Sequence, residues 1–272
     1  MSDVRALTTA SGCHLFSGCG YPAPSITNFY FKPLFSIGSF HFTKPMALAL
    51  FCALLVVGFS WLAFHKPKMV PRGFQNIGEF GLLFVRDQIL RPSLGKNGDR
   101  FLPFLLSLFF FVWVMNVMGV VPLVDFPAMS RFAFPVALAA MVWVTYITLG
   151  MRHQGAFGYF RNMAVPEGAP WWILPLLIPI ELLSNIFVRP FTLSIRLFAN
   201  MMAGHLLLLV FSLATWYLLT FSHFGISLVF SGVSFILVIV LTGLEVLIQA
   251  LQAFIFATLT ATYIAGALEA AH

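Results

Sequence analysis

The stretch PIELLSNIFVRPFTLSIRLFANMMAGHLLLLVFSLATWYLLTF, residues 179–221, decides the fold class of this 272-residue chain. A second apolar stretch, FGISLVFSGVSFILVIVLTGLEVLIQALQAFIFATLTATYIAGAL, follows it at residues 224–268. As a helix, each stretch would reach about 65 Å at about 1.5 Å per residue, whereas the hydrocarbon core of a bilayer is about 30 Å thick. Ordinary spans rarely tilt by more than about 40°. We therefore expect a long helical hairpin at residues 171–268 that lies obliquely in the membrane.

Shorter apolar runs precede the hairpin. Residues 46–65, 101–121 and 132–150 each have the roughly 20 residues that cross a bilayer once, which predicts transmembrane helix 1 at 46–65 and a transmembrane hairpin at 101–150. Only 9% of the residues are charged and 60% are hydrophobic, whereas a soluble domain carries about a quarter charged residues. The composition therefore excludes an ordinary soluble protein.

Residues 72–91 differ from the spans because, on a helical wheel, the polar residues share one face and apolar residues take most of the rest. The polar face of this segment consists of Arg72, Gln75, Asn76, Glu79, Arg86 and Asp87. Such a segment is typical of a helix that lies on a membrane surface. The complete prediction is an all-α integral membrane protein with three ordinary transmembrane helices, one amphipathic surface helix and a long oblique two-helix hairpin.

The distribution of Lys and Arg predicts the orientation of the chain. Nine of them lie on the side that holds residues 65–100 and the loop after residue 150, against four on the other side. Because the larger count belongs inside, we expect an extracytoplasmic tail at 1–45, a cytoplasmic surface helix at 72–91 and a cytoplasmic C-terminus. A multi-pass protein of the bacterial plasma membrane fits this pattern, with an organelle inner membrane as the alternative.

The net charge of +6 does not predict a nucleic-acid partner, because the basic residues form no patch interleaved with aromatic side chains. Cys13 and Cys19 lie in the tail, where a disulfide and two free thiols are both open interpretations. No spacing typical of a metal site is present in the sequence, and we expect no cofactor.

Two polar stripes interrupt the apolar hairpin. At 100° per residue, the residues that share the face of Arg196 are Glu181, Asn185, Arg189, Thr192 and Asn200, while His205 lies opposite. The second stripe includes Glu245, Gln249 and Gln252. Charges within a membrane are costly and usually functional, so the two stripes predict a polar path through the lipid.

The side-chain types suggest a role for each residue of this path. Arginine effectively never releases its proton, so Arg196 suits a fixed positive charge. Glu181, Glu245 and His205 can take up and release protons. The amides of Asn185, Asn200, Gln249 and Gln252 do not titrate but can hold ordered water. A proton path is the interpretation that uses all of these groups.

These residues also resemble a known family. The run RPFTLSIRLFANMMAGH at 189–205, Glu245 with LQAFIF at 251–256, and WVMNVMGVVP at 113–122 resemble subunit a of ATP synthases. The resemblance implies a non-catalytic stator subunit that offers two offset half-channels to the carboxylates of a c-ring. It further implies that Arg196 faces the ring, and that the other partners are stalk subunit b, the catalytic head through the stalk, and lipid.

The resemblance also suggests which half-channel each residue serves. The residues that match the family's outer half-channel are Asn200, His205, Glu245 and Gln252. Glu181 matches part of its inner half-channel. Structural roles are the alternatives: a snorkelling or ion-paired Arg196, a packing His205 with Glu245 as its partner, and a helix-entry Glu181. Rival functions are a secondary transporter, a haem-bearing respiratory subunit and a passive scaffold, and the choice between proton and sodium is open.

Overall fold

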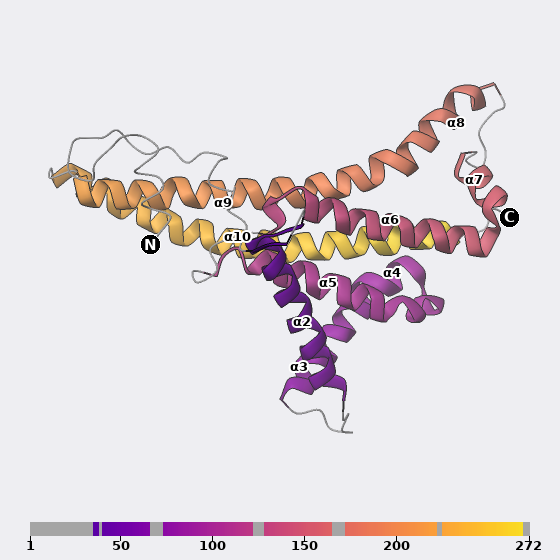
Figure 1. Cartoon of the computed structure of the whole chain (residues 1–272), viewed down its shortest axis with the longest axis horizontal. Helices are drawn as coiled ribbons and strands as arrows, with labels where there is room; N and C mark the ends of the chain where they lie inside the picture. Colours follow the sequence, from indigo (N-terminus) through magenta and orange to yellow (C-terminus); the bar gives the residue numbers. More distant parts are fainter. Residues whose placement is uncertain are drawn as a thin grey trace.

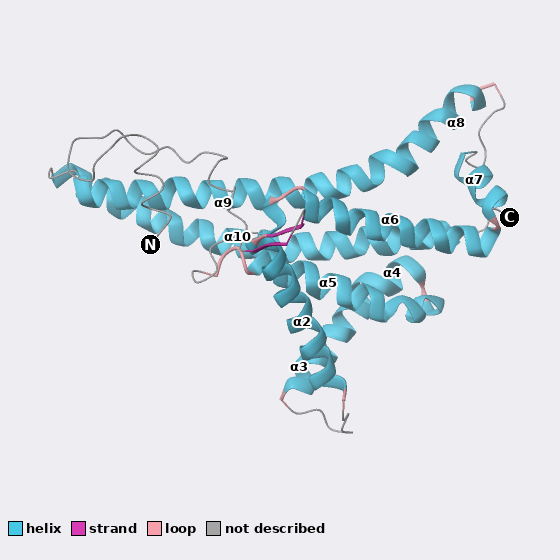
Figure 2. Cartoon of the chain, in the orientation of Figure 1, coloured by secondary structure: helices cyan, strands magenta, loops and turns pink. Residues whose placement is uncertain are grey.

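The computed structural model of the chain describes residues 35–37, 40–65, 73–121, 128–164, 172–221 and 225–268. This part is almost entirely helical (Figure 2), apart from an antiparallel pair of short strands, β1 (Phe35–Ile37) and β2 (Phe40–Phe42). Its helices are α2 (Lys44–Phe64), α3 (Phe74–Phe84), α4 (Arg91–Leu94), α5 (Leu102–Val117), α6 (Ala133–Gln154), α7 (Ala156–Ala164), α8 (Leu174–Leu183), α9 (Arg189–Phe221) and α10 (Gly225–Leu268). Most of the predicted tail, with Cys13 and Cys19, lies outside the described residues.

The predicted fold class is confirmed. Within the described residues, five helical segments are long and apolar enough to cross a membrane: Lys44–Phe64, Gly98–Val117, Ala133–Gln154, Leu174–Leu219 and Leu228–Leu268. The last two have 46 and 41 residues, about twice the length of an ordinary span. Figure 1 shows α9 and α10 side by side along the long axis of the molecule, while α2 runs away from the hairpin at a steep angle. The tilt of this hairpin to the membrane stays a prediction.

The first arm of the hairpin extends beyond the apolar stretch 179–221 towards the N-terminus. It begins five residues earlier, at Leu174, and contains a π-helical turn at Ser184–Val188. Pro190 has no N–H to donate to the preceding turn, and the irregular turn ends just before it. Figure 1 shows α8 rising away from the line of α9, so the arm is one bent helix.

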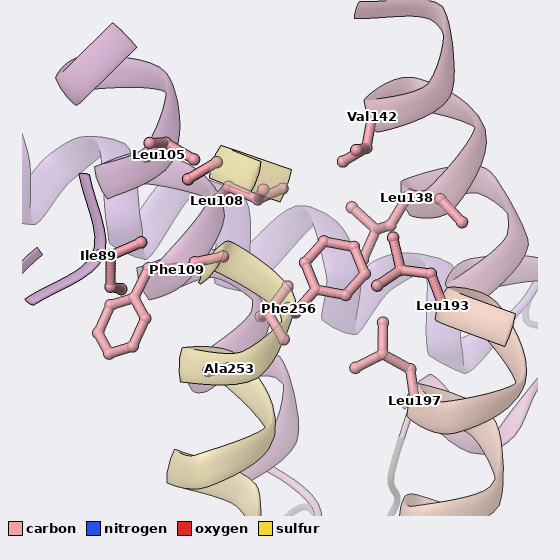
Figure 3. Packing of buried hydrophobic residues seen from close by; sticks show 14 of the residues in the cluster. Ile89, Leu105, Leu108, Phe109, Leu138, Val142, Leu193, Leu197, Ala253 and Phe256 are labelled. Carbon is pink, nitrogen blue, oxygen red and sulfur yellow. The ribbon is translucent and has the colours of Figure 1, made fainter. Parts of the chain in front are cut away.

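The core lies where α5, α6, α9 and α10 meet. Figure 3 shows the ring of Phe256 on α10 close to the leucines Leu138 of α6 and Leu193 and Leu197 of α9. Ala253, Ala257 and Ala261 follow each other at four-residue intervals on α10, and all three are fully buried. Small residues at this spacing let helix backbones approach closely. Close packing matters in a membrane because an apolar side chain gains little free energy when it moves from lipid to a helix interface.

The predicted surface helix at 72–91 begins at Phe74 and continues through a π-helical turn, Val85–Leu90, into α4. Glycines form its inner face: a Cβ on Gly78 would lie 2.7 Å from Cβ of Ala63, and one on Gly81 would lie 2.5 Å from Cζ of Phe110. The predicted polar face is wrong for Gln75, which is buried. Its amide donates to Oε1 of Glu79 at 2.8 Å.

Large apolar side chains of α3 instead point outward, and they are Phe74, Ile77, Phe80 and Leu83. The glycine face of α3 packs against other helices, so these apolar side chains are left to contact lipid. This arrangement agrees with a helix that lies at a membrane surface.

The end of α6 turns sharply into α7. Gly155 has a φ of +78°, a left-handed conformation that glycine adopts without strain. The turn brings the ring of Tyr159 onto Gly150, where any Cβ would collide with that ring. Gln154 donates through Nε2 to the carbonyl of Ala267 at 3.1 Å, which ties this corner to the last turn of α10.

Candidate functional site

A row of buried polar side chains lies on α10. Glu245, Gln249 and Gln252 are each at most 5% exposed, and their i, i+4 and i+7 spacing places them on one helix face. Nε2 of Gln249 donates to Oε1 of Glu245 at 3.4 Å. Within the described residues, Oε2 of Glu245 and Oε1 of Gln249 have no hydrogen-bond partner. The structure therefore brings together the second predicted stripe and leaves it with open hydrogen-bonding capacity.

The two arms of the hairpin are joined by an amide pair. Nδ2 of Asn200 on α9 donates to Oε1 of Gln252 on α10 at 2.8 Å. Nε2 of Gln252 has no partner within the described residues. This contact places Asn200 beside the α10 row, although Asn200 lies on the face of α9 that holds Arg196.

Gly204 brings the carboxylate of Glu245 close to the backbone of α9. A Cβ on Gly204 would lie 3.0 Å from Oε1 of Glu245, which is tighter than ordinary contact. His205, the next residue, is buried at 6% exposure. Both titratable groups of the predicted outer path are thus buried within the same part of the hairpin, at the level where Gly204 meets Glu245.

Open hydrogen-bonding atoms in such a place are suited to binding ordered water. A buried polar atom without a partner costs about 1–3 kcal/mol, and buried waters commonly satisfy such atoms. On α5, Asn116 is also fully buried, and neither polar atom of its side chain has a partner within the described residues. A carboxylate among amides and water can accept a proton and pass it on.

Arg196 lies on a different surface. Its side chain is exposed, as are those of Thr192 and Asn200 on the same face, whereas the adjacent Leu193 and Leu197 are buried in the core. No ion pair or hydrogen bond joins the Arg196 side chain to any residue in the described ranges. A charge at membrane depth is expensive without a partner, so the exposed Arg196 side chain is available to a counter-charge beyond the described residues.

The remaining predicted residues lie towards α8. Asn185 is buried, and its Nδ2 donates to Oε2 of Glu181 at 3.4 Å. The hydroxyl of Tyr146 on α6 donates to the backbone carbonyl of Asn185 at 2.8 Å. The helical wheel assumed an unbroken α-helix, and this assumption is wrong because a π-helical turn contains Asn185 and lies between Glu181 and Arg196.

Sequence reasoning missed two residues of this site, Tyr146 and Gly204. Tyr146 stands within an apolar span, and a tyrosine there is a weak signal for a hydrogen bond to another helix. Gly204 precedes His205 directly, and its role depends on a contact with Glu245 across the hairpin. No pattern within either segment predicts that contact.

The fold and the site together define a class: a multi-pass helical membrane protein with titratable and water-binding side chains inside a long hairpin and an arginine presented outward. Comparison with known proteins agrees. The profile of the family described as "ATP synthase A chain" matches residues 46–265. The chain belongs to this family.

Curated relatives span nearly the whole chain. ATP synthase subunit a of Streptomyces lividans is 45% identical over 99% of this chain and 95% of the relative. The subunit a of Frankia alni is 47% identical over 92% of this chain and 86% of the relative. The subunit a of Rhodococcus erythropolis is 40% identical over 92% of this chain and 91% of the relative. Family membership identifies a multi-pass, proton-translocating subunit of the Fo membrane sector, in a complex with other ATP synthase subunits.

Proposed function

We propose that the chain is the stator half of the proton path in a rotary ATP synthase, with two offset half-channels that meet a ring of carboxylates. The outer half-channel uses Asn200, His205, Glu245, Gln249 and Gln252. The amide contact between Asn200 and Gln252, and the open atoms of Glu245 and Gln249, support a hydrated route through the hairpin. The residues of the inner half-channel are Glu181 and Asn185, which are hydrogen-bonded to each other.

Arg196 acts as a fixed charge in this mechanism. A proton from the outer half-channel neutralises a ring carboxylate, which then enters the lipid as the ring rotates. When the site reaches the inner half-channel it loses the proton, and the charged carboxylate is attracted to Arg196. Because arginine keeps its own proton, the same charge repels a proton that would pass directly between the half-channels.

The single observation behind this proposal is the exposed Arg196 side chain without a partner among the described residues, next to a hairpin whose interior holds a carboxylate and amides. The driving force is the membrane potential, which supplies about 2.3 kcal/mol per proton per 100 mV. The subunit does no bond chemistry itself. Its partners are the c-ring, stalk subunit b, the catalytic head through that stalk, and lipid.

The proposed location is the bacterial plasma membrane, with the N-terminus outside and the C-terminus in the cytoplasm. Arg86 pairs with Asp99 at 3.1 Å and Arg91 pairs with Asp87 at 3.0 Å, all with partly exposed side chains. These ion pairs suit the aqueous side of the membrane that the count of basic residues identifies as the inside.

The test is ATP-driven proton pumping by inverted vesicles that contain the whole complex. Arg196→Ala is expected to abolish pumping at a normal level of assembled complex, because the ring carboxylate loses its fixed counter-charge. Arg161→Ala is the matched control, since Arg161 is an exposed arginine on α7, outside the spans. Normal pumping by Arg196→Ala would contradict the proposed function.

A further inference from the structure

In the π-helical turn Ser184–Val188, the backbone carbonyl of Asn185 receives a donor in neither the α-helical nor the π-helical register. In an α-helix, the carbonyl of Asn185 would accept from the N–H of Arg189, but here that N–H donates to the carbonyl of Ser184. In the π register, the carbonyl of Asn185 would accept from residue 190, which is a proline without an N–H. Neither helical register therefore satisfies Asn185.

Tyr146 on α6 supplies the missing donor. Its hydroxyl lies 2.8 Å from the carbonyl oxygen of Asn185, and both residues are at most 5% exposed. Its ring contacts the ring of Tyr263 on α10 with a centroid separation of 5.8 Å. Cζ of Arg189 lies 5.3 Å from the centroid of the Tyr263 ring. Packing between three helices thus holds the hydroxyl in place.

This bond lies at the turn that sets the rotation of one helix segment relative to another. A π-helical turn adds a residue to the α-helical repeat, so it turns everything before it about the helix axis. Glu181 and Asn185 lie on or before the turn, and Arg196 lies after it. Without a donor for the Asn185 carbonyl, the π-helical turn loses a hydrogen bond that favours it over a regular α-helical turn.

We propose that Tyr146 is a positioning residue for proton transfer: by satisfying the carbonyl that Pro190 leaves open, it sets the orientation of Glu181 and Asn185 relative to Arg196. The proposal rests on the proposed function, in which Glu181 and Asn185 form the inner half-channel. Tyr146 itself exchanges no proton in this account, and its effect passes through the backbone of Asn185.

The test compares the wild type, Tyr146→Phe, Pro190→Ala and the double variant in vesicles that hold the whole complex. ATP-driven pumping is measured per assembled complex, with the amount of the subunit determined separately. Tyr146→Phe should lower pumping per complex by about fivefold or more, since a buried carbonyl loses its donor. Adding Pro190→Ala should restore pumping to within about twofold of Pro190→Ala alone, because residue 190 then offers an N–H to the same carbonyl.

Tyr159→Phe is the matched control. Tyr159 is another buried tyrosine, its ring packs against α6, and its hydroxyl forms no hydrogen bond within the described residues. We expect it to pump like the wild type. If Tyr146→Phe fails to assemble, restored assembly in the double variant supports the proposal and continued failure overturns it.

Three results would overturn the inference: unchanged pumping by Tyr146→Phe, a loss that Pro190→Ala does not reverse, or a lower amount of complex with unchanged pumping per complex. Arg196→Ala in the same series keeps the two proposals apart. If that variant loses pumping while Tyr146→Phe keeps it, the inference fails and the proposed function stands. If Arg196→Ala pumps normally, the proposed function fails first.

Discussion

Gly204→Ala tests whether the place of the Glu245 carboxylate matters for transport. A Cβ at this position would lie 3.0 Å from Oε1, 3.1 Å from Cδ and 3.3 Å from Cγ of Glu245, so the side chain must move by a few tenths of an ångström. Overpacking of a filled site costs about 1–3 kcal/mol. Since the displaced atoms belong to a flexible side chain, we expect a cost near the lower end of this range, about 1–1.5 kcal/mol.

ATP-driven pumping per assembled complex should therefore fall about five- to tenfold, given that about 1.4 kcal/mol corresponds to a factor of ten. Gly58→Ala on α2 is the control, because a Cβ there meets no atom within 4 Å. It should pump normally, as alanine also favours the helix. Wild-type pumping by Gly204→Ala would show that proton transport does not require the Glu245 carboxylate to occupy this place.

The other predictions concern contacts that hold the site in place. A double-mutant cycle with Asn200→Leu and Gln252→Leu measures the thermal stability of the purified complex. It should give a coupling free energy of about 1 kcal/mol, because one 2.8 Å hydrogen bond joins the two amides. Additive effects of the two substitutions would contradict this contact. Gly150→Ala should reduce the amount of assembled subunit several-fold, because its Cβ collides with the ring of Tyr159. Gly266→Ala, where a Cβ meets nothing within 4 Å, should not. Equal amounts of both variants would count against the packing of α7 on α6.

The spans could be predicted from sequence because a bilayer demands about 20 consecutive apolar residues. Residues 46–65 were expected and Lys44–Phe64 was found, and the expected run 132–150 corresponds to Ala133–Gln154. The single face of Glu245, Gln249 and Gln252 was predictable for the same kind of reason, since α10 is unbroken there and helical spacing alone aligns them.

The inner part of the site could not be predicted in this way. The π-helical turn depends on Pro190 and on a donor from Tyr146, which is 39 residues away from Asn185 in the chain. A helical wheel takes neither contact into account. It therefore placed Asn185 and Arg196 on one face by assuming a regular spacing that the helix does not have. The burial of Gln75 was missed because charge pattern identifies a polar face, whereas glycine packing decides which face meets another helix.

In the proposed mechanism Arg196 has two roles: it attracts the ring carboxylate, and it is the barrier between the half-channels. The most direct measurement is passive proton flux through the membrane sector, in vesicles stripped of the catalytic head and driven by an imposed potential. Arg196→Ala should conduct protons faster than the wild type while it loses coupled pumping, because protons then pass between the half-channels without rotation. A flux equal to or below that of the wild type would contradict the barrier role, and coupled pumping at the wild-type rate would contradict the whole account.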